Sequence, residues 1–277
     1  MSMKKEKELL VAVASQKGGV GKSVFTVLLA SVLHYRKGLR VAVVDCDSPQ
    51  HSIALMRERD IENVMKNDDL KVGLYRQHER IQKPAYPVIK SDPEKAVEDL
   101  RRYTGEKGEV FDVVLFDLPG TLRSEGVVYT VAAMDYIFVP LKADNIVMQS
   151  SLQFTKALEE ELIAKGNCNL KGIRLFWNMV DRRGRKDLYE AWNRVIHRMG
   201  LRLLSSRVPN TLRYTREADP VRKGVFRSTL FPPDSRQEKD SGLPELVEEI
   251  CRAIGLEEPA AGRVDDRAIT DDRIQTP

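Results

Sequence analysis

The segment Leu9–Ser23, LLVAVASQKGGVGKS, decides the fold. Its first six residues, 9–14, form an uninterrupted apolar run, which is typical of a strand buried on both faces of a parallel sheet. Glycine-rich residues follow at once, and residues 23–35 then carry apolar side chains at helical spacing. A strand that ends in a glycine-rich turn and leads directly into a helix is the setting of a phosphate-binding loop.

Residues 15–23 supply the chemistry that such a loop needs. Glycines allow backbone N–H groups to converge on phosphate oxygens, and the helix N-terminus adds the positive end of its dipole. We expect Lys22 on the β- and γ-phosphates and the Ser23 hydroxyl on Mg²⁺. The predicted nucleotide contacts in the loop are Lys17, Gly18, Gly19, Val20, Gly21, Lys22 and Ser23. The alternative is a glycine-rich turn without a ligand.

The rest of the chain alternates apolar runs with amphipathic segments. Strands are predicted at 40–46, 110–116, 136–141, 173–178 and 201–204, and more weakly at 70–75 and 87–90. Helices are predicted at 50–59, 149–165, 187–199 and 243–254, with another that starts at Ser91-Asp92-Pro93 and continues over 94–103. This order predicts an α/β P-loop NTPase fold, with a mainly parallel sheet and helices on both faces. We expect a single domain over 1–256, and a disordered acidic tail over 257–277.

Composition excludes several classes of protein. The 277 residues contain 45 Lys or Arg and 41 Asp or Glu, so the net charge of +4 rules out a wholly basic nucleic-acid binder. No run of eighteen apolar residues occurs, and the charged first residues lack the apolar centre of a signal peptide. Three widely spaced cysteines fit a reducing compartment. We therefore expect a cytoplasmic protein that does not bind membranes.

Acidic residues end two of the predicted strands. Asp45 and Asp47 bracket Cys46, and strand alternation would place both carboxylates on one side, at the edge where open α/β sheets bind ligands. Capping of the next helix is the alternative role for this pair. Asp117 ends the strand at 110–116, and a carboxylate there can hold Mg²⁺ through water. Gly120 leaves the following loop free to respond to the γ-phosphate.

The stretch QKGGVGKS resembles the deviant phosphate loop of the ParA/MinD family of dimerising ATPases. The resemblance implies that Lys17 crosses a dimer interface to the partner's phosphates, so that ATP holds a homodimer together. It implies that Asp47 positions or activates the attacking water and that Asp45 supports the metal shell. Lys17, Lys22 and Asp47 would then be the catalytic group, and Ser23, Asp45 and Asp117 the metal group. An inserted Ser48 departs from the family's pattern of Asp-x-Asp-Pro-Gln.

Two further positions resemble the family's base-binding residues. Asn178 follows a predicted strand, and an amide there can pair with the adenine edge as both donor and acceptor. Pro209 resembles a residue of the loop near the base, although Asn210 stands where the family often has arginine. An asparagine at a strand end can also be a simple turn former.

The region 171–227 is far more basic than the whole chain, with fifteen Lys or Arg against five Asp or Glu. Arginine predominates, which suits phosphate contacts. ParA-like proteins bind DNA non-specifically as ATP dimers, and the resemblance implies the same here. The candidate DNA contacts are Arg182, Arg183, Arg185, Lys186, Arg213 and Arg216. A solvated charged surface is the alternative.

The sequence thus predicts an ATPase, with ATP or ADP and Mg²⁺ as cofactors, that hydrolyses slowly and is stimulated by an unidentified partner protein. Its nucleotide state would switch DNA and partner binding in DNA partitioning or conjugative transfer. Residues 227–232, RSTLFP, add a resemblance to the conjugative-transposon type. The alternative is a metabolic or metal-cluster-maturation ATPase of the same fold without DNA binding. The helix at 243–254 has glutamates opposite its apolar stripe, which favours core packing over membrane binding.

Overall fold

A computed structural model describes residues 8–120, 125–163, 166, 168–181, 183, 186–217 and 225–256. Its strands form one seven-stranded sheet in the order β3-β2-β4-β1-β5-β6-β7, and every pairing is parallel. The strands are β1 (Leu9–Val13), β2 (Val41–Asp45), β3 (Val88–Lys90), β4 (Val113–Asp117), β5 (Tyr136–Leu141), β6 (Gly172–Val180) and β7 (Leu203–Pro209). The predicted α/β architecture is confirmed.

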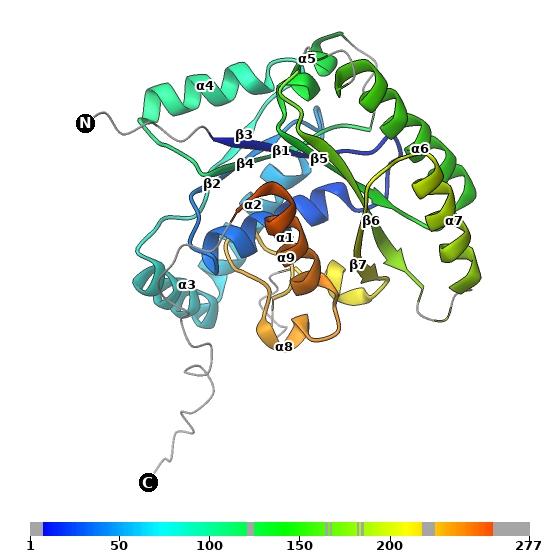
Figure 1. The fold of residues 1–277 in the computed structure, drawn as a ribbon. Helices are drawn as coiled ribbons and strands as arrows, with labels where there is room; N and C mark the ends of the chain where they lie inside the picture. The colour runs from blue at the N-terminus through cyan, green and yellow to red at the C-terminus, as the bar shows by residue number, and fades with distance from the viewer. Residues whose placement is uncertain are drawn as a thin grey trace.

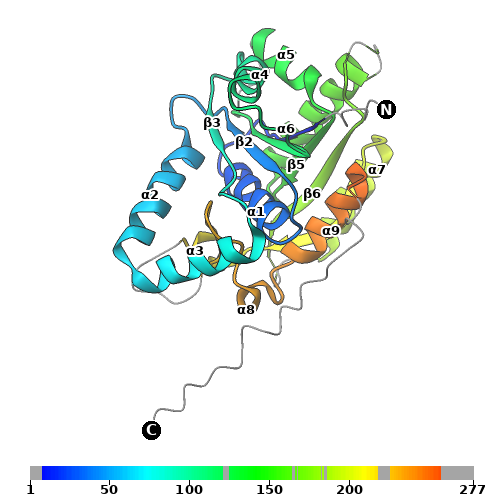
Figure 2. The same cartoon turned by 90° about the vertical axis from the view of Figure 1, so that its left-hand side faces the viewer.

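Helices cover both faces of this sheet (Figures 1 and 2). The helices are α1 (Lys22–Tyr35), α2 (Ser52–Lys66), α3 (Asp68–Ile81), α4 (Ala96–Lys107), α5 (Glu125–Ala133), α6 (Asn145–Leu158), α7 (Lys186–Arg198), α8 (Ser235–Glu238) and α9 (Leu243–Ile254). A π-helical turn (Glu159–Ile163) continues α6, and a 3₁₀ turn (Leu212–Thr215) follows β7. Helices α4 to α7 pack on one face, whereas α1, α2 and α9 pack on the other.

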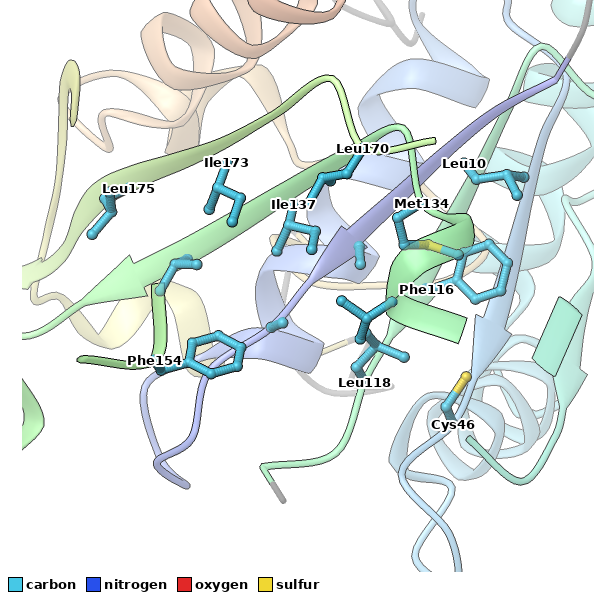
Figure 3. Close-up of a cluster of buried hydrophobic side chains, with 14 of the residues drawn as sticks. Leu10, Cys46, Phe116, Leu118, Met134, Ile137, Phe154, Leu170, Ile173 and Leu175 are labelled. Atoms are coloured by element: carbon cyan, nitrogen blue, oxygen red, sulfur yellow. The ribbon is translucent and has the colours of Figure 1, made fainter. Parts of the chain in front are cut away.

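Each face of the sheet has its own hydrophobic core, because successive strand side chains point to opposite faces. Figure 3 shows the core beneath α4 to α7, where Leu10, Phe116, Ile137 and Ile173 meet from four neighbouring strands. Cys46 is fully buried in this cluster, as the sequence predicts for a small core residue. Burial raises the pKa of its thiol well above the ordinary value.

The strand predicted at 70–75 is wrong, because this segment lies inside helix α3. Leu70, Val72 and Leu74 alternate like a strand, but the helix begins where the Asn67 side chain accepts a hydrogen bond from the Leu70 N–H at 3.0 Å. The helix buries little beyond Gln77. Its apolar side chains Leu70, Leu74 and Ile81 lie at helical spacing but are only partly buried, so the helix adds little to the core.

Several predicted boundaries also shift. Helix α2 runs on to Lys66, well past the predicted end at residue 59, and α4 begins at Ala96 rather than at the Ser91-Asp92-Pro93 sequence. Helix α6 begins earlier than predicted, after Asp144 accepts hydrogen bonds from two of its first N–H groups. Strand β7 extends to Pro209, and helix α5 was not anticipated. The predicted tail at 257–277 lies outside the described residues.

Helix α9 matches its predicted bounds and buries its whole apolar stripe against the sheet. This confirms core packing for the helix. No described helix is both long enough and apolar enough to cross a bilayer.

On the edge strand β7, a side chain of α9 accepts hydrogen bonds from two backbone N–H groups. The Glu249 carboxylate accepts hydrogen bonds from the backbone N–H groups of Ser205 and Ser206, at 2.7 and 2.8 Å, and from the Ser205 hydroxyl at 2.9 Å. Both serines belong to the edge strand β7. The outward N–H groups at this point of the edge are therefore already bonded.

Candidate functional site

The phosphate-loop residues lie at the carboxyl edge of the sheet, between β1 and α1. Helix α1 begins after Gly21, whose φ of 89° is left-handed, and no side chain caps its first turn. Its first N–H groups are therefore directed out of the helix without a side-chain acceptor, which is the arrangement that binds phosphate. An added Cβ at Gly18 or Gly19 would meet nothing within 4 Å, so the loop backbone is open to a ligand.

Asn178 braces this loop from strand β6. Its Nδ2 donates a 2.7 Å hydrogen bond to the Val20 carbonyl, and its side chain is buried. A Cβ added to Gly21 would lie 2.7 Å from the same nitrogen, so glycine is required there both for its φ and for space. The sequence missed this bracing role. The predicted adenine contact of Asn178 stays a prediction.

The two lysines of the loop, Lys17 and Lys22, are half-buried. The Lys17 backbone N–H donates to the Ser15 hydroxyl at 3.3 Å, which helps to fix the start of the loop. No carboxylate of the described residues forms an ion pair with either ammonium group. Both charges are thus available to an anion at the loop.

Asp45, at the end of β2, is fully buried and caps a helix. Its Oδ2 accepts hydrogen bonds from the backbone N–H groups of Ile53 and Ala54, both at 2.9 Å, in the first turn of α2. The structure therefore confirms, for this residue, the helix-capping role that the sequence left open. Its predicted place in the metal shell stays a prediction.

Asp117, at the end of β4, lies directly opposite Asp45 in the strand register and is also fully buried. Neither of its carboxylate oxygens has a hydrogen-bond partner among the described residues. Burial is the main reason that its pKa rises to about 7, with the nearby Asp45 charge acting in the same direction. Ser23 and Lys22 are close enough to lower this pKa in part.

A bare buried carboxylate of this kind fits a divalent cation. Burying an ionised group without a partner is costly, and a hard cation with oxygen ligands would satisfy both carboxylate oxygens. The Ser23 hydroxyl stands beside Asp117, so the donor set is the hydroxyl and carboxylate pair predicted for Mg²⁺. A Cβ added to Gly120 would lie 3.4 Å from the Gln16 carbonyl oxygen, so the loop after β4 passes close to the start of the phosphate loop.

Asp47 lies in the loop after β2 rather than in the strand, and its side chain is half-buried. The loop turns back on itself, because the His51 N–H donates to the Asp47 carbonyl at 2.9 Å and His51 adopts a left-handed φ of 42°. The His51 ring lies 3.2 Å from the Asp45 carbonyl oxygen. Asp47 is therefore held next to the capped end of α2, at the same edge as Asp117.

The remaining predicted residues are spread more widely. Pro209 ends β7 opposite Val180 of β6, which places it at the carboxyl edge near Asn178. Arg183 and Lys186 are exposed, and Arg182 and Arg185 lie outside the described residues. Arg216 is exposed, whereas Arg213 donates to backbone carbonyls, one of them that of Gln237 at 3.0 Å. Arg213 thus has a structural contact that the sequence did not predict.

Comparison with known families matches residues 11–219 to the model described as CobQ/CobB/MinD/ParA nucleotide binding domain. Among curated proteins, the chain is 29% identical over 178 residues to the chromosome-partitioning ATPase Soj of Thermus thermophilus. That match covers 62% of this chain and 70% of Soj.

Solved structures share the fold at low sequence identity. A putative plasmid partition protein from Borrelia burgdorferi, bound to AMPPNP, superposes with a TM-score of 0.58 at 20% identity, over 90% of this chain and 99% of that one. The MinC:MinD cell division protein complex of Aquifex aeolicus gives a TM-score of 0.55 at 14% identity, over 92% and 99%.

Proposed function

Because this chain belongs to the CobQ/CobB/MinD/ParA nucleotide-binding family, with the ATPase fold of ParA and MinD, we propose that it is a partition-type ATPase whose bound nucleotide controls dimerisation. ATP binds at the loop 17–23, with its phosphates on the open backbone and on Lys22. Ser23 and Asp117 would hold Mg²⁺, which would neutralise phosphate charge. Lys17 of each subunit reaches the nucleotide of the other.

The observation that supports this proposal most directly is the bare Asp117 carboxylate beside Lys22 and Ser23. A merely structural aspartate at a strand end is hydrogen-bonded, as Asp45 is. A buried carboxylate that Ser23 and Lys22 compensate only in part, at an open glycine loop, is instead suited to a metal–nucleotide complex. The likeness to Soj supports a role in partition rather than in metabolism.

The two loop lysines separate binding from dimerisation. Lys22→Ala removes the charge on the β- and γ-phosphates, so we expect ATP affinity to fall by at least a hundredfold. Lys17→Ala is expected to keep ATP binding within about tenfold and to lose the ATP dimer. Fluorescent-ATP titration and sedimentation with ATP, with ADP and without nucleotide measure the two effects. Lys66→Ala, on the exposed side of α2, is the matched control.

The proposed cross-subunit contact is wrong if Lys17→Ala dimerises with ATP as well as the wild type does. A loss of ATP binding in Lys17→Ala equal to that in Lys22→Ala would also contradict it, because both lysines would then serve one nucleotide.

Asp47 is the proposed residue that positions the attacking water. We expect Asp47→Ala to bind ATP, to hydrolyse it at least tenfold more slowly and to accumulate as the ATP dimer. Phosphate release and sedimentation test this. Hydrolysis at the wild-type rate would show that another group positions the water.

DNA binding by the basic region 171–227 is a further part of the proposal. The ATP dimer would present two copies of this region, so affinity for a random duplex should be higher with ATP than with ADP and should fall steeply with salt. Arg183→Gln and Arg216→Gln should weaken it, because both side chains are exposed. If the affinity for the duplex is the same with ATP as with ADP, the alternative of a metabolic or metal-cluster-maturation ATPase is favoured. The conjugative role rests on residues 227–232 alone and stays a prediction.

A further inference from the structure

A cavity of about 370 Å³ opens at the start of β6, far from the phosphate loop. Lys156, Glu159 and Glu160 line it from the end of α6, Lys171, Gly172, Ile173 and Arg174 from the start of β6, and Gly200 and Arg202 from the turn before β7. Asn178, which braces the phosphate loop, lies near the other end of the same strand. This cavity therefore belongs to a different surface from the nucleotide site.

Arg174 is an unusual residue for its position. Strand β6 lies between β5 and β7, and the residues on either side of Arg174, Ile173 and Leu175, are buried. The Arg174 side chain is half-buried, and burial, together with repulsion from Arg202, lowers its pKa. A guanidinium group in such a place is normally paired with a carboxylate.

Neither arginine of the cavity has such a partner in the part of the chain that the structure describes. Arg174 donates only to the Ile173 carbonyl, at 3.1 Å, and neither Arg174 nor Arg202 lies within 4.0 Å of a carboxylate oxygen. Glu159 interacts with both only at longer range. Two cations thus face a common space without a bound countercharge.

The other two cations of the lining are already paired. Lys156 lies 3.7 Å from Glu160, and Lys171 lies 3.1 Å from Asp135. The positive charge that remains is therefore concentrated on the two arginines, opposed by Glu159 alone.

Local backbone features make room for this arrangement. The Arg174 guanidinium folds over Gly172, where an added Cβ would lie 2.6 Å from Nη1. Across the cavity, Glu159 begins the π-helical turn at the end of α6, and such turns are frequent at functional sites. Gly172 thus leaves room for the Arg174 guanidinium beside the cavity.

We propose that this cavity binds a small phosphorylated anion, held by Arg174 and Arg202. Two guanidinium groups recognise phosphate oxygens by paired hydrogen bonds, and a phosphate between them removes their mutual repulsion. Glu159 favours a ligand that also carries a hydroxyl or amine donor. The volume lies at the small end of the range of about 300–1,000 Å³ for ligand pockets, which suits a compact molecule.

The same arginines could contact phosphates of a DNA backbone, so the test must distinguish the two sources. The recessed position of Arg174 favours the small ligand, because a duplex presents its phosphates on a convex surface. Glycine amides provide a local readout: Gly172 and Gly200 line this cavity, whereas Gly18, Gly19 and Gly21 belong to the phosphate loop.

The experiment titrates inorganic pyrophosphate, without nucleotide, into the full chain labelled with ¹⁵N-glycine and follows the assigned glycine amides by NMR. We expect saturable shifts at Gly172 and Gly200, separate from those in the phosphate loop. Arg202→Gln, at an exposed side chain, should weaken the cavity shifts at least tenfold and leave the loop shifts unchanged. Arg174→Gln should do the same, with its folding checked by circular dichroism. Arg194→Gln, exposed on α7 and outside the cavity, is the matched control.

Gly172→Ala offers a test that keeps all charges. Its Cβ displaces the Arg174 guanidinium, so pyrophosphate binding should weaken several-fold at Gly200. Unchanged cavity shifts in both arginine variants would overturn the proposal, as would the absence of cavity shifts with pyrophosphate. Shifts at Gly172 and Gly200 produced by a random duplex but not by pyrophosphate would overturn it in favour of a DNA contact.

Discussion

The ends of β2 and β4 lie side by side, and each carries a fully buried aspartate at the same register. The two differ in their partners: Asp45 receives two backbone hydrogen bonds from α2, whereas neither oxygen of Asp117 has a partner among the described residues. The first carboxylate stabilises the fold by itself. The second has no such bonds, which is why we propose it, and not Asp45, as the main metal-binding carboxylate of the pair.

The largest effect on stability is expected from Asp45→Ala. The change leaves the N–H groups of Ile53 and Ala54 without an acceptor and should lower the free energy of unfolding by about 2–4 kcal/mol. Urea denaturation without nucleotide measures it. Wild-type stability in this variant would mean that α2 finds another cap and that the contrast between the two aspartates is false.

Asp117→Asn should act in the opposite direction and depend on pH. The Asp117 carboxyl has a higher pKa in the folded chain than in the unfolded one, so its ionisation destabilises the folded wild type. This loss of stability begins as the pH rises above about 4 and is complete above about 7. The variant should therefore be more stable than the wild type at pH 8, by at most about 4 kcal/mol, with a difference that vanishes near pH 4. Thermal unfolding across this range, without nucleotide, gives the answer.

The same variant should bind ATP no better with Mg²⁺ than without it, because the proposed carboxylate for the ion is gone. Asp69→Asn, exposed in the first turn of α3, controls for the loss of one charge. If ATP binding by Asp117→Asn depends on Mg²⁺ as it does in the wild type, the proposed metal-binding role of Asp117 is wrong.

The smallest effect concerns Cys46, which follows Asp45 and whose N–H donates to the Asp117 carbonyl at 3.1 Å. Cys46→Ala should cost only about 1 kcal/mol in unfolding free energy, since one buried sulfur is lost. Because burial raises the pKa of its thiol, native Cys46 should resist iodoacetamide at pH 8, whereas the half-buried Cys168 reacts. Mass spectrometry of the labelled chain distinguishes them. Equal labelling of the two thiols would show that this strand end opens easily.

Much of the fold could be predicted because it follows from continuous apolar runs. The buried strands β1, β2, β4 and β5 are each largely such a run, β6 is mostly apolar around Arg174 and Asn178, and α9 has a clear apolar stripe. Helix α3 could not be recognised in this way, since it buries little and its apolar residues alternate. Its actual signal was the cap at Asn67, followed by two aspartates.

Parts of the candidate site that are contiguous in the sequence could be predicted. Contacts between residues far apart in the sequence could not. The glycine loop with Lys22 and Ser23 is one short stretch. The role of Asp45 depends on N–H groups eight and nine residues further along, and a capping aspartate and a metal-binding one look alike in the sequence. The cavity at Arg174 gathers side chains from three separate segments, so composition shows only that the region is basic.

The Glu249 carboxylate of α9, which is bonded to the edge strand β7, has a consequence for strand pairing. Burial would raise its pKa, but the hydrogen bonds from Ser205 and Ser206 outweigh that effect and lower it, so the group stays ionised at neutral pH. The carbonyl groups of another strand that approached β7 here would need free N–H donors, but they would meet the Glu249 carboxylate, which is an acceptor. The pairing of another strand with this part of β7 is thereby disfavoured while the carboxylate is ionised.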